Sequence, residues 1–480
     1  MLGRVNVLMV SSEVAPYAKT GGLGDVVGAL PKYLRQLGHD VRVVMPFYSS
    51  IDTARLDLEA GDPFTVRLGG HHYTVRLVTS ASAPGMIFVH CSELYARGRL
   101  YTSDPDEHRR FLVLTWAALH AAQRLGFAPD VIHCNDWQTG LLPLTLRAAF
   151  GWDRLFANTK TLLSIHNLNY QGAFPSWTLH DTNLDPDRHL FHQDQLAQGR
   201  INYLLHGILY AGGVATVSPT YAKEIQREEH GVGLDPYLRA RKSTVVGILN
   251  GVDYDEWSPE RDPLIAARYS AADLAGKARC KEALLTSLGL PYVPGVPLVG
   301  IVSRMASQKG FDLLHGVMPD LLRRWGFQLV VLGSGEPRLE QMFAAFQRAF
   351  PRQVVFYKGF SNPLAHQIEA GADIFLMPSR YEPCGLNQMY SLRYGTVPIV
   401  HRTGGLADTV APWNPQSRAG DGFVFEHHDP AGVRWALETA LATFRDKDAW
   451  ARLIQNGMAK DYSWEKSARL YELVYSRLGS

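Results

Sequence analysis

Short apolar runs alternate with amphipathic segments along the whole chain. The first run, residues 5–10, alternates and then becomes wholly apolar, which is typical of a strand buried in a parallel sheet. After a glycine-rich loop, the apolar residues of 26–37 recur at helical spacing, and Gly38 follows where a helix C-cap is expected. The other strands predicted in this half are residues 41–45, 131–133, 162–165 and 214–217.

A second series of apolar runs begins near Leu298, with helix-like segments between the runs. Alternating strands and helices predict a mostly parallel sheet covered on both faces. Two such series predict two doubly wound α/β domains, which suits a chain of 480 residues because one hydrophobic core stops growing at about 250–300 residues. The strands predicted in this half are residues 298–302, 328–332, 354–357, 374–377 and 397–400.

The boundary between the domains is marked by turn and linker signals. Residues 250–253 (Asn-Gly-Val-Asp) predict a turn, and the polar, proline-bearing stretch 257–263 suits a linker. We therefore predict domains at residues 1–255 and 256–458, followed by a C-terminal segment at 459–480. That segment contains an amphipathic helix from Trp464 to Leu478, with apolar residues available for packing at Leu470, Tyr471, Leu473, Val474 and Leu478.

Composition excludes several classes of protein. Lys and Arg number 48 against 46 Asp and Glu, so the chain lacks the basic character of a nucleic-acid-binding protein. The four cysteines are widely spaced without a C-x-x-C pair, which excludes a disulfide framework or a zinc site. The N-terminus lacks a signal peptide, and no apolar run approaches the roughly 18 residues of a membrane span. We expect a cytoplasmic protein without nucleic-acid or membrane partners.

The loop after the first strand, residues 19–25 (Lys-Thr-Gly-Gly-Leu-Gly-Asp), is a candidate anion site. In open α/β sheets ligands bind beyond the carboxyl ends of the strands. Glycines let the backbone approach a ligand, the helix N-terminus attracts an anion, and Lys19 adds a full charge. Val27 stands where a dinucleotide fingerprint has its third glycine, and no Walker pattern follows. The alternative is a tight turn that simply requires glycine.

Residues 303–310 (Ser-Arg-Met-Ala-Ser-Gln-Lys-Gly) follow the strand 298–302 and carry two cations. Arg304 supplies a bidentate fork and Lys309 a point charge, so together they can neutralise a diphosphate leaving group without a metal. The alternative is a pair of solvated surface charges.

Two more loops follow strands of the second half. In residues 380–388, Pro383 restricts Glu382 to extended conformations and Gly385 permits close backbone approach. A carboxylate held in this way can stabilise positive charge on a sugar ring or bind its hydroxyls. The alternative for Glu382 is an acid that offsets a helix dipole. Residues 403–408 (Thr-Gly-Gly-Leu-Ala-Asp) form a second anion-binding helix start.

Polar residues also follow two strands of the first half, at 135–137 (Asn-Asp-Trp) and 166–169 (His-Asn-Leu-Asn). A lone histidine is usually structural, but His166 lies at a strand end between asparagines. The chain has no H-E-x-x-H, no G-x-S-x-G and no Cys/His array with ligand spacing. The Asp-x-Asp pairs occur in polar or turn context, so we predict no metal site.

Five of these segments, taken together, resemble the glycogen and starch synthases of glycosyltransferase family 5, and most closely the bacterial glycogen synthases. They are residues 19–25, 250–253, 303–310, 378–388 and 403–410, which run in family order through almost the full chain. The resemblance implies a GT-B fold: two Rossmann-like domains, an interdomain cleft, and a C-terminal helix that crosses back to the first domain. It also implies retaining transfer of glucose from ADP-glucose to the non-reducing end of an α-1,4-glucan such as glycogen or a maltooligosaccharide, with no metal or pyridoxal phosphate.

The same resemblance implies roles for individual residues. Arg304 and Lys309 would hold the diphosphate, Glu382 would contact the donor glucose near its reacting carbon, and Phe360 would lie near the adenine. Donor binding is implied for Lys19, Gly22, Asp25, Asn250, Arg304, Lys309, Phe360, Cys384, Gly385, Leu386, Thr403, Gly404 and Gly405. Catalytic roles are implied for Asp136, His166, Arg304, Lys309 and Glu382, and acceptor contacts for Tyr95, Trp137 and Asn167.

One position departs from the broader retaining GT-B group, in which a second Glu often follows the first by eight positions. Tyr390 stands there, which removes any case for a paired-carboxylate mechanism at this motif. Three alternatives stay open: a GT-B transferase that uses UDP-glucose, a glucan-binding protein without activity, and a phosphorylase, which would carry pyridoxal phosphate.

Overall fold

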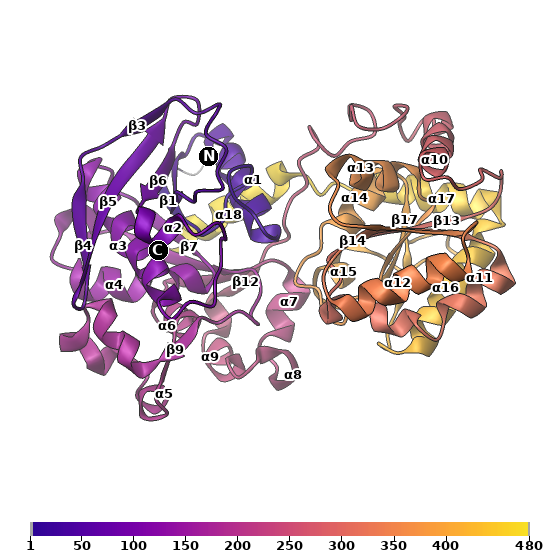
Figure 1. Ribbon diagram of the computed structural model, residues 1–480. Coiled ribbons are helices and arrows are strands. Elements are labelled where there is room, and N and C mark those ends of the chain that lie inside the picture. The colour runs from indigo at the N-terminus through magenta and orange to yellow at the C-terminus, as the bar shows by residue number, and fades with distance from the viewer. Residues whose placement is uncertain (1–2, 479–480) are drawn as a thin grey trace. The chain divides into compact units, whose positions relative to one another are not determined.

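The computed structural model describes residues 3–478, which form two compact α/β units (Figure 1). Unit 1 contains the residues up to Val217, Ala222–Ile248 and the chain from Trp464 onward. Unit 2 contains Ser218–Tyr221 and Leu249–Ser463. The chain thus enters unit 2 before the predicted boundary at 255/256 and returns to unit 1 after the predicted residue 459.

Unit 1 is built on a ten-stranded sheet in the order β12-β11-β8-β7-β1-β2-β6-β5-β3, with β4 paired to β5. Its strands from β12 to β6 are parallel, as predicted, whereas β3, β4 and β6 each pair antiparallel with β5. The strands of this half-exposed antiparallel extension, in which side chains alternate between two faces, were not among the strands predicted from the sequence. The bounds are β1(Asn6–Val10), β2(Asp40–Pro46), β3(Leu58–Ala60), β4(Phe64–Leu68), β5(His71–Ser80), β6(Met86–His90), β7(Val131–Asn135), β8(Lys160–Ile165), β11(Gly213–Thr216) and β12(Val245–Gly247), with a separate antiparallel pair β9(Ala173–Pro175) and β10(Arg200–Asn202).

Unit 2 is built on a six-stranded, wholly parallel sheet in the order β15-β14-β13-β16-β17-β18. Numbered within the unit this is 3-2-1-4-5-6, the order of a Rossmann fold. In Figure 1, α10, α13 and α14 cover one face of this sheet and α11, α12 and α16 the other. The strands are β13(Leu298–Val302), β14(Gln328–Gly333), β15(Val354–Lys358), β16(Ile374–Met377), β17(Val397–His401) and β18(Phe423–Phe425).

Helices connect the strands of both units. Up to residue 248 they are α1(Gly22–Gln36), α2(Ser92–Tyr95), α3(Glu107–Arg124), α4(Leu142–Ala149), α5(Gln193–Ala197), α6(Tyr203–Tyr210), α7(Pro219–Glu224), α8(Glu228–Gly231) and α9(Asp235–Ala240). The rest are α10(Ala275–Ser287), α11(Met318–Trp325), α12(Pro337–Ala349), α13(Asn362–Gly371), α14(Asn387–Arg393), α15(Gly404–Thr409), α16(Pro430–Phe444), α17(Lys447–Met458) and α18(Trp464–Leu478). Short 3-10 helices include η1(Trp137–Thr139), η3(Ser176–Thr182) and η6(Ser307–Lys309).

Helix α1 follows the predicted pattern closely. Its apolar positions, such as Val26, Leu30 and Leu34, are buried. Gly38 has a φ of 97°, and its N–H donates to the carbonyl of Arg35, so glycine ends the helix as expected.

The C-terminal helix α18 belongs to unit 1, where it packs against α1 and β8. Its buried stripe consists of Trp464, Ala468, Tyr471 and Tyr475, and the Tyr475 hydroxyl hydrogen-bonds Nδ1 of His133 at 2.8 Å. The prediction that Leu470 and Leu473 pack was wrong, because both lie off this stripe and are exposed. The buried face follows three aromatic residues and Ala468 at i, i+4, i+7 and i+11 rather than the leucines.

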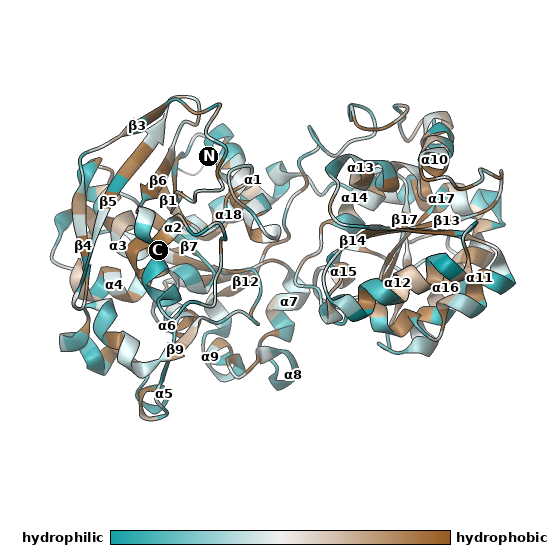
Figure 2. Ribbon diagram, viewed as in Figure 1, coloured by the Kyte–Doolittle hydropathy of each residue, from teal (hydrophilic) through white to brown (hydrophobic). Residues whose placement is uncertain are grey.

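The apolar colour in Figure 2 concentrates on the central strands, while much of helix α12 is hydrophilic. Residues 7–10 of β1 are fully buried, as a strand covered on both faces requires. All four cysteines are buried and free. Within residues 3–478, no helix is both long and apolar enough to cross a membrane. The cytoplasmic location stays a prediction.

Candidate active site

In each unit the predicted site residues gather at the point where the strand order reverses. In unit 1 the loop after β1 and the residues after β7 meet, since β1 and β7 are adjacent parallel strands. In unit 2 the loops after β13 and β16 meet for the same reason. Crossovers leave such a pair of strands in opposite directions, which opens a crevice beyond their carboxyl ends. We call the group of predicted site residues at each reversal point a half-site.

The glycine loop of unit 1 is held by a buried carboxylate that the motif analysis missed. Glu13 accepts hydrogen bonds from the backbone N–H of Thr20 at 2.6 Å, from its hydroxyl at 2.8 Å and from the N–H of Gly21 at 3.2 Å. The Tyr101 hydroxyl donates to the same carboxylate at 2.6 Å. Glu13 lies three residues after the end of the predicted strand 5–10, and this place in the sequence was the signal that could have found it.

The glycines of this loop have different functions. A Cβ added at Gly24 would lie 2.5 Å from Cβ of Lys19, and one at Gly28 would lie 2.6 Å from the carbonyl of Ala15, so the fold itself requires these glycines. An added Cβ at Gly21 or Gly22 meets no described atom within 4 Å. The folded chain does not need glycine there, which indicates that the open space serves a ligand.

Lys19 is half-exposed and pairs with Asp25 at 2.7 Å. The ammonium therefore lies at the N-terminus of α1, where no side chain caps the helix. This end of the helix combines a full positive charge with uncapped backbone N–H groups, an arrangement suited to an anion. Asp25 orients Lys19 and is itself an acid, so any part it has in binding an anion is indirect.

Asp136 has a strained backbone. Its φ of 56° and ψ of −171° are rare for any residue except glycine. Its Oδ1 accepts a hydrogen bond from the N–H of His166 at 2.7 Å, and burial raises the pKa of this carboxyl to about 7. Strain of this kind, held in place by the surrounding fold, is typical of functional sites.

His166 is buried and presents an unused acceptor. Its Nε2 lies 3.0 Å from Oδ1 of Asn135, and because that oxygen can only accept, Nε2 carries the proton and donates. Burial lowers the pKa of His166 to about 3, so the ring is neutral. Nδ1 is then a hydrogen-bond acceptor, and it has no partner within residues 3–478. A buried acceptor of this kind is open to a hydrogen-bond donor such as a water or a ligand hydroxyl.

Of the residues predicted to contact the acceptor, two are buried in the core and one is half-buried. Tyr95 is 1% exposed and donates its hydroxyl to the carbonyl of Arg110, so its ring belongs to the core. Trp137 is 9% exposed and packs between Phe111 and Phe174 at 5.0 and 5.5 Å. Asn167 is half-buried, and its side-chain oxygen accepts from the N–H of Asn169 at 3.1 Å. Acceptor contacts by these residues stay a prediction.

In unit 2 the cations and the carboxylate predicted as one site do come together. Lys309 Nζ lies 2.6 Å from Oε2 of Glu382, and the hydroxyl of Ser379 donates to the same oxygen at 2.9 Å. Both members of the ion pair are largely shielded from solvent. Arg304 is exposed, and its side chain makes no hydrogen bond to any other described residue. Arg304, Lys309 and Ser379 line a small cavity of about 140 Å³, whose full lining is Val302, Ser303, Arg304, Lys309, Phe311, Leu376, Met377, Ser379 and Asn387.

The two loops of unit 2 are fixed to each other through their backbones. The N–H of Arg380 donates to the carbonyl of Gln308 at 2.9 Å. Gly310 has a φ of 69°, and a Cβ there would collide with the carbonyl of Pro378. The half-buried carboxylate of Glu336 accepts from the N–H of Ser307 at 2.6 Å. Arg304 and Lys309 are thereby held beside Glu382 by a stiff framework.

The Thr-Gly-Gly segment supports the Glu382 loop. Added Cβ atoms at Gly404 and Gly405 would collide with the carbonyls of Glu382 and Cys384, and the N–H of Gly405 donates to Glu382 O at 3.1 Å. Thr403 is buried and precedes α15, a helix of a single turn or so. The N–H of Gly405 is therefore used inside the protein, and a phosphate contact by this segment stays a prediction.

The other predicted donor residues surround that loop. Gly385 has a φ of 74°, and a Cβ there would lie 2.5 Å from the side chain of Gln388, whose Nε2 donates to the carbonyls of Cys384 and Gly385. Burial raises the pKa of the Cys384 thiol to about 12, and backbone of Asn250 hydrogen-bonds it. Leu386 is half-buried and precedes α14.

Phe360 and Tyr390 have opposite environments. Phe360 follows β15 and is 80% exposed, which leaves both faces of its ring accessible. Tyr390, the residue in place of a second Glu, stacks on Trp257 at 3.9 Å with an interplanar angle of 1°. His366 stacks on Trp257 at 3.7 Å. Tyr390 therefore holds the segment that was predicted as the linker against unit 2.

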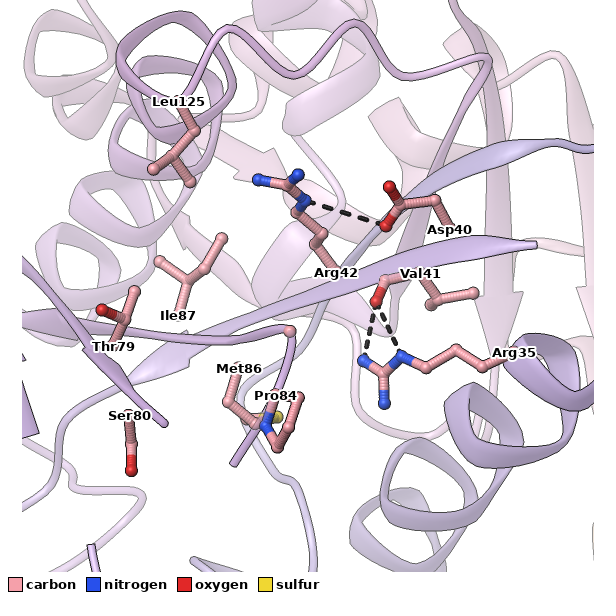
Figure 3. Close-up of a pocket in the computed structure, with 11 residues that line it drawn as sticks. Arg35, Asp40, Val41, Arg42, Thr79, Ser80, Pro84, Met86, Ile87 and Leu125 are labelled. Carbon is pink, nitrogen blue, oxygen red and sulfur yellow. Dashed lines mark hydrogen bonds and ion pairs between the residues drawn. The ribbon is translucent and has the colours of Figure 1, made fainter. Parts of the chain in front are cut away.

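A larger cavity of about 360 Å³ lies elsewhere in unit 1, where β2 and β6 begin (Figure 3). Its cations are already engaged. Arg35 donates twice to the carbonyl of Val41, at 2.6 and 3.0 Å, while Arg42 lies over the ring of Phe127 and beside Asp40. The cavity is at the amino ends of the parallel strands, opposite the edge at which such sheets bind ligands.

Within residues 3–478, no group of three or more His, Cys, Asp or Glu side chains is arranged to hold a metal ion. The expectation that no metal or pyridoxal phosphate is required stays a prediction.

Comparison with known proteins accounts for both units. A family model described as the starch synthase catalytic domain matches residues 6–240, and one described as glycosyl transferases group 1 matches residues 293–458. The chain is 45% identical to the glycogen synthase of Anaeromyxobacter sp. strain Fw109-5, across 99% of this chain and 100% of that protein. It is also 45% identical to the glycogen synthase of Myxococcus xanthus, across 99% of each.

Solved structures agree with this assignment. The catalytic domain of starch synthase IV from Arabidopsis thaliana, bound to ADP and acarbose, matches with a TM-score of 0.92 and 34% identity over 99% of this chain and 100% of that one. Sucrose-phosphate synthase from Thermosynechococcus elongatus matches with a TM-score of 0.62 and 18% identity, over 99% of each chain, and so shares the fold alone. The predicted GT-B fold is confirmed, and the chain belongs to the glycogen and starch synthase family of glycosyltransferases.

Proposed function

We propose that this chain elongates an α-1,4-glucan at its non-reducing end with glucose from ADP-glucose, retains the anomeric configuration and releases ADP. One observation carries the proposal furthest. Arg304, Lys309 and Ser379 line one cavity at the reversal point of the unit 2 sheet, and Glu382 is bound to both Lys309 and Ser379. The side chain of Arg304 makes no hydrogen bond to any described residue, so it is available to a ligand. The starch synthase relative was solved bound to ADP, which supports ADP as the leaving group here.

Unit 2 supplies the charges that the departing diphosphate needs. Leaving of ADP develops negative charge on the diphosphate and positive charge on the sugar ring. Arg304 can grip two phosphate oxygens and Lys309 adds a second full charge, so these residues stabilise the leaving group. Glu382 is held by Ser379 and Lys309, and its fixed carboxylate acts on the opposite charge at the ring or on its hydroxyls.

Unit 1 supplies neutral, buried groups that suit a sugar. Nδ1 of His166 accepts a hydrogen bond from a glucose hydroxyl, because its lone pair has no described partner. The Asp136 carboxyl accepts from the backbone N–H groups of His166 and Asn167, and we expect it to accept from a sugar hydroxyl as well. Lys19 and the open backbone at Gly22 suit the phosphates at the start of α1.

The reaction breaks the bond between glucose C1 and the diphosphate oxygen and forms a bond between C1 and the acceptor's 4-hydroxyl oxygen. The acceptor's hydroxyl proton passes to the departing diphosphate. Attack and departure take place on the same face of the sugar, which retains configuration without a protein nucleophile. A glucosyl group trapped on Glu382 or Asp136 would overturn this mechanism.

We also propose that the reaction needs neither a metal nor pyridoxal phosphate, since Arg304 and Lys309 supply the positive charge at the diphosphate. Turnover should therefore persist in excess EDTA. The purified protein should lack the absorbance of pyridoxal phosphate, which a phosphorylase would show.

The deciding experiment measures ADP and UDP release from ADP-glucose and UDP-glucose, each with and without glycogen. We expect glycogen-dependent ADP release that collapses in Glu382→Ala, with elongated chains retaining α-linkage by NMR. A preference for UDP-glucose would replace the donor and keep the reaction. No turnover of either donor, with glycogen still bound, would favour a glucan-binding protein without activity.

A further inference from the structure

The donor cavity of unit 2 is lined by one amide side chain, Asn387, which lies in the predicted loop 380–388 but has no predicted role. Asn387 is the first residue of α14 and borders the cavity beside Ser303, Arg304, Lys309 and Ser379. Directly behind it lies Glu369 of α13, which is fully buried. A buried carboxylate in contact with a cavity-lining amide needs a physical explanation, because burying an acid is costly unless hydrogen bonds compensate.

Glu369 fixes which way the Asn387 amide faces. Its Oε1 accepts from Nδ2 of Asn387 at 3.2 Å, and its Oε2 accepts from the hydroxyl of Ser391 at 2.7 Å. With Nδ2 turned toward Glu369, the amide oxygen Oδ1 is left for the cavity. Within residues 3–478 no hydrogen bond to Oδ1 is present.

The chemistry of an amide oxygen selects its partner. Oδ1 can only accept a hydrogen bond, and the ionised phosphates of a nucleotide sugar can also only accept. A hydroxyl can donate to Oδ1, and the hydroxyls of the transferred sugar lie next to the diphosphate. We propose that Glu369 is a positioning residue, which holds Oδ1 of Asn387 toward the cavity so that it accepts a hydrogen bond from a hydroxyl of the donor sugar. This inference rests on the proposed use of the cavity for a nucleotide sugar.

The surroundings of Glu369 keep this arrangement over a wide pH range. Burial raises the pKa of Glu369 to about 8, and burial lowers the pKa of the neighbouring Lys277 on α10 to about 8. The Lys277 ammonium donates to the hydroxyl of Thr396 at 2.7 Å and to the carbonyl of Ala370 at 3.0 Å. Whether Glu369 carries its proton on Oε2 or is ionised, Oε1 still accepts from Asn387. The amide orientation is therefore the same in these two protonation states.

Three variants of the full-length protein test the proposal in the ADP-release assay. Glu369→Met keeps the length of the side chain and removes both acceptors, so the Asn387 amide loses its fixed orientation. Glu369→Gln keeps a carbonyl for Asn387 and can donate to Ser391. Asn387→Ala removes Oδ1 itself. We expect KM for ADP-glucose to rise about tenfold in Glu369→Met and Asn387→Ala, as expected for one lost hydrogen bond, and by less than about threefold in Glu369→Gln.

The inhibition constant of ADP separates the sugar from the diphosphate. ADP has no transferred sugar, so its inhibition constant should stay within about twofold of wild type in all three variants. A matched control is Asp421→Asn, which alters another buried carboxylate of unit 2, paired with Lys460 at 3.2 Å and absent from the cavity lining. We expect this control to lower Tm and leave KM unchanged.

Each outcome decides the matter. An unchanged KM in Asn387→Ala, or an ADP inhibition constant that rises in parallel with KM, would overturn the proposed sugar contact. A KM in Glu369→Gln as high as in Glu369→Met would overturn the positioning role. If Glu369→Met does not fold, Asn387→Ala takes its place in that comparison, and a KM in Glu369→Gln as high as in Asn387→Ala would overturn the positioning role. A wild-type protein that turns over neither nucleotide sugar would overturn the proposed function and this inference with it, whereas an active wild type with insensitive variants would overturn the inference alone.

Discussion

The two half-sites occupy the same place in two similar sheets, yet they present different chemistry. In unit 1 the groups after β1 and β7 include a strained, buried Asp136 and a neutral, buried His166. In unit 2 the groups after β13 and β16 are an exposed Arg304 and a Lys309–Glu382 ion pair. Neutral buried acceptors suit sugar hydroxyls, and cations suit a diphosphate. The same topology thus supports both tasks because only the residues beyond the strand ends differ.

The lysines of the two half-sites differ in environment. Lys309 is 17% exposed and pairs with the buried Glu382, whereas Lys19 is 48% exposed and pairs with the exposed Asp25. A charge is screened less where water is excluded, so Lys309 should contribute more to the stabilisation of a developing charge.

The largest expected effect is the loss of kcat/KM when these two lysines are replaced. Lys309→Met should lower kcat/KM by about 100- to 1,000-fold, the range for losing one preorganised electrostatic contact. Lys19→Met should lower it by only about tenfold, because an exposed ammonium is partly replaced by water. Steady-state ADP release measures both. Equal losses would show that burial does not separate the two half-sites.

The second largest expected effect is the loss of activity when the strained residue Asp136 is replaced by glycine. Asp136→Gly relieves a φ of 56°, a gain of about 1–3 kcal/mol, and loses the hydrogen bond to His166 N–H, a loss of similar size. We therefore expect Tm to change little while kcat/KM falls about 100-fold. Calorimetry with the ADP-release assay tests this. A variant with full activity would show that the Asp136 carboxylate acts only in folding.

The third effect compares two glycines in one loop. In Gly22→Ala the added Cβ meets no described atom within 4 Å, and alanine favours the helix α1 more than glycine does. We therefore expect Tm to stay level or rise, while KM for ADP-glucose rises about tenfold. Gly24→Ala forces a Cβ to within 2.5 Å of Lys19 Cβ, so Tm should fall. If Gly22→Ala leaves KM unchanged, the open space beside it does not receive the donor.

The smallest effect is a pH dependence of stability. The folded-state pKa of Asp136, about 7, lies above that of an unfolded aspartate. The stability that this group contributes is fully present below the unfolded pKa and is lost as the pH rises through about 7. Asp136→Asn cannot ionise, so the Tm difference between wild type and this variant should shift against wild type between about pH 5 and pH 8. A constant difference across that range would contradict the raised pKa.

The elements that position the half-sites could be predicted from the sequence because they depend on local patterns. The strands 298–302 and 374–377 and the helix 464–478 form over the predicted residues. Each contributes either a continuous apolar run or an amphipathic stripe, and the glycine-bearing loops that follow the strands lie at the carboxyl edge by the rules of parallel sheets.

What only the tertiary structure decided is how far each side chain is buried and what it contacts. Tyr95 and Trp137 are aromatic residues near strand ends, yet packing places both in the core. The contacts of Glu13 with Tyr101 and of Glu369 with Asn387 join residues far apart in the chain. Periodicity reports which face of an element is apolar. It carries no information on which distant side chain fills the space beside a buried acid, since that follows from how elements pack together in three dimensions.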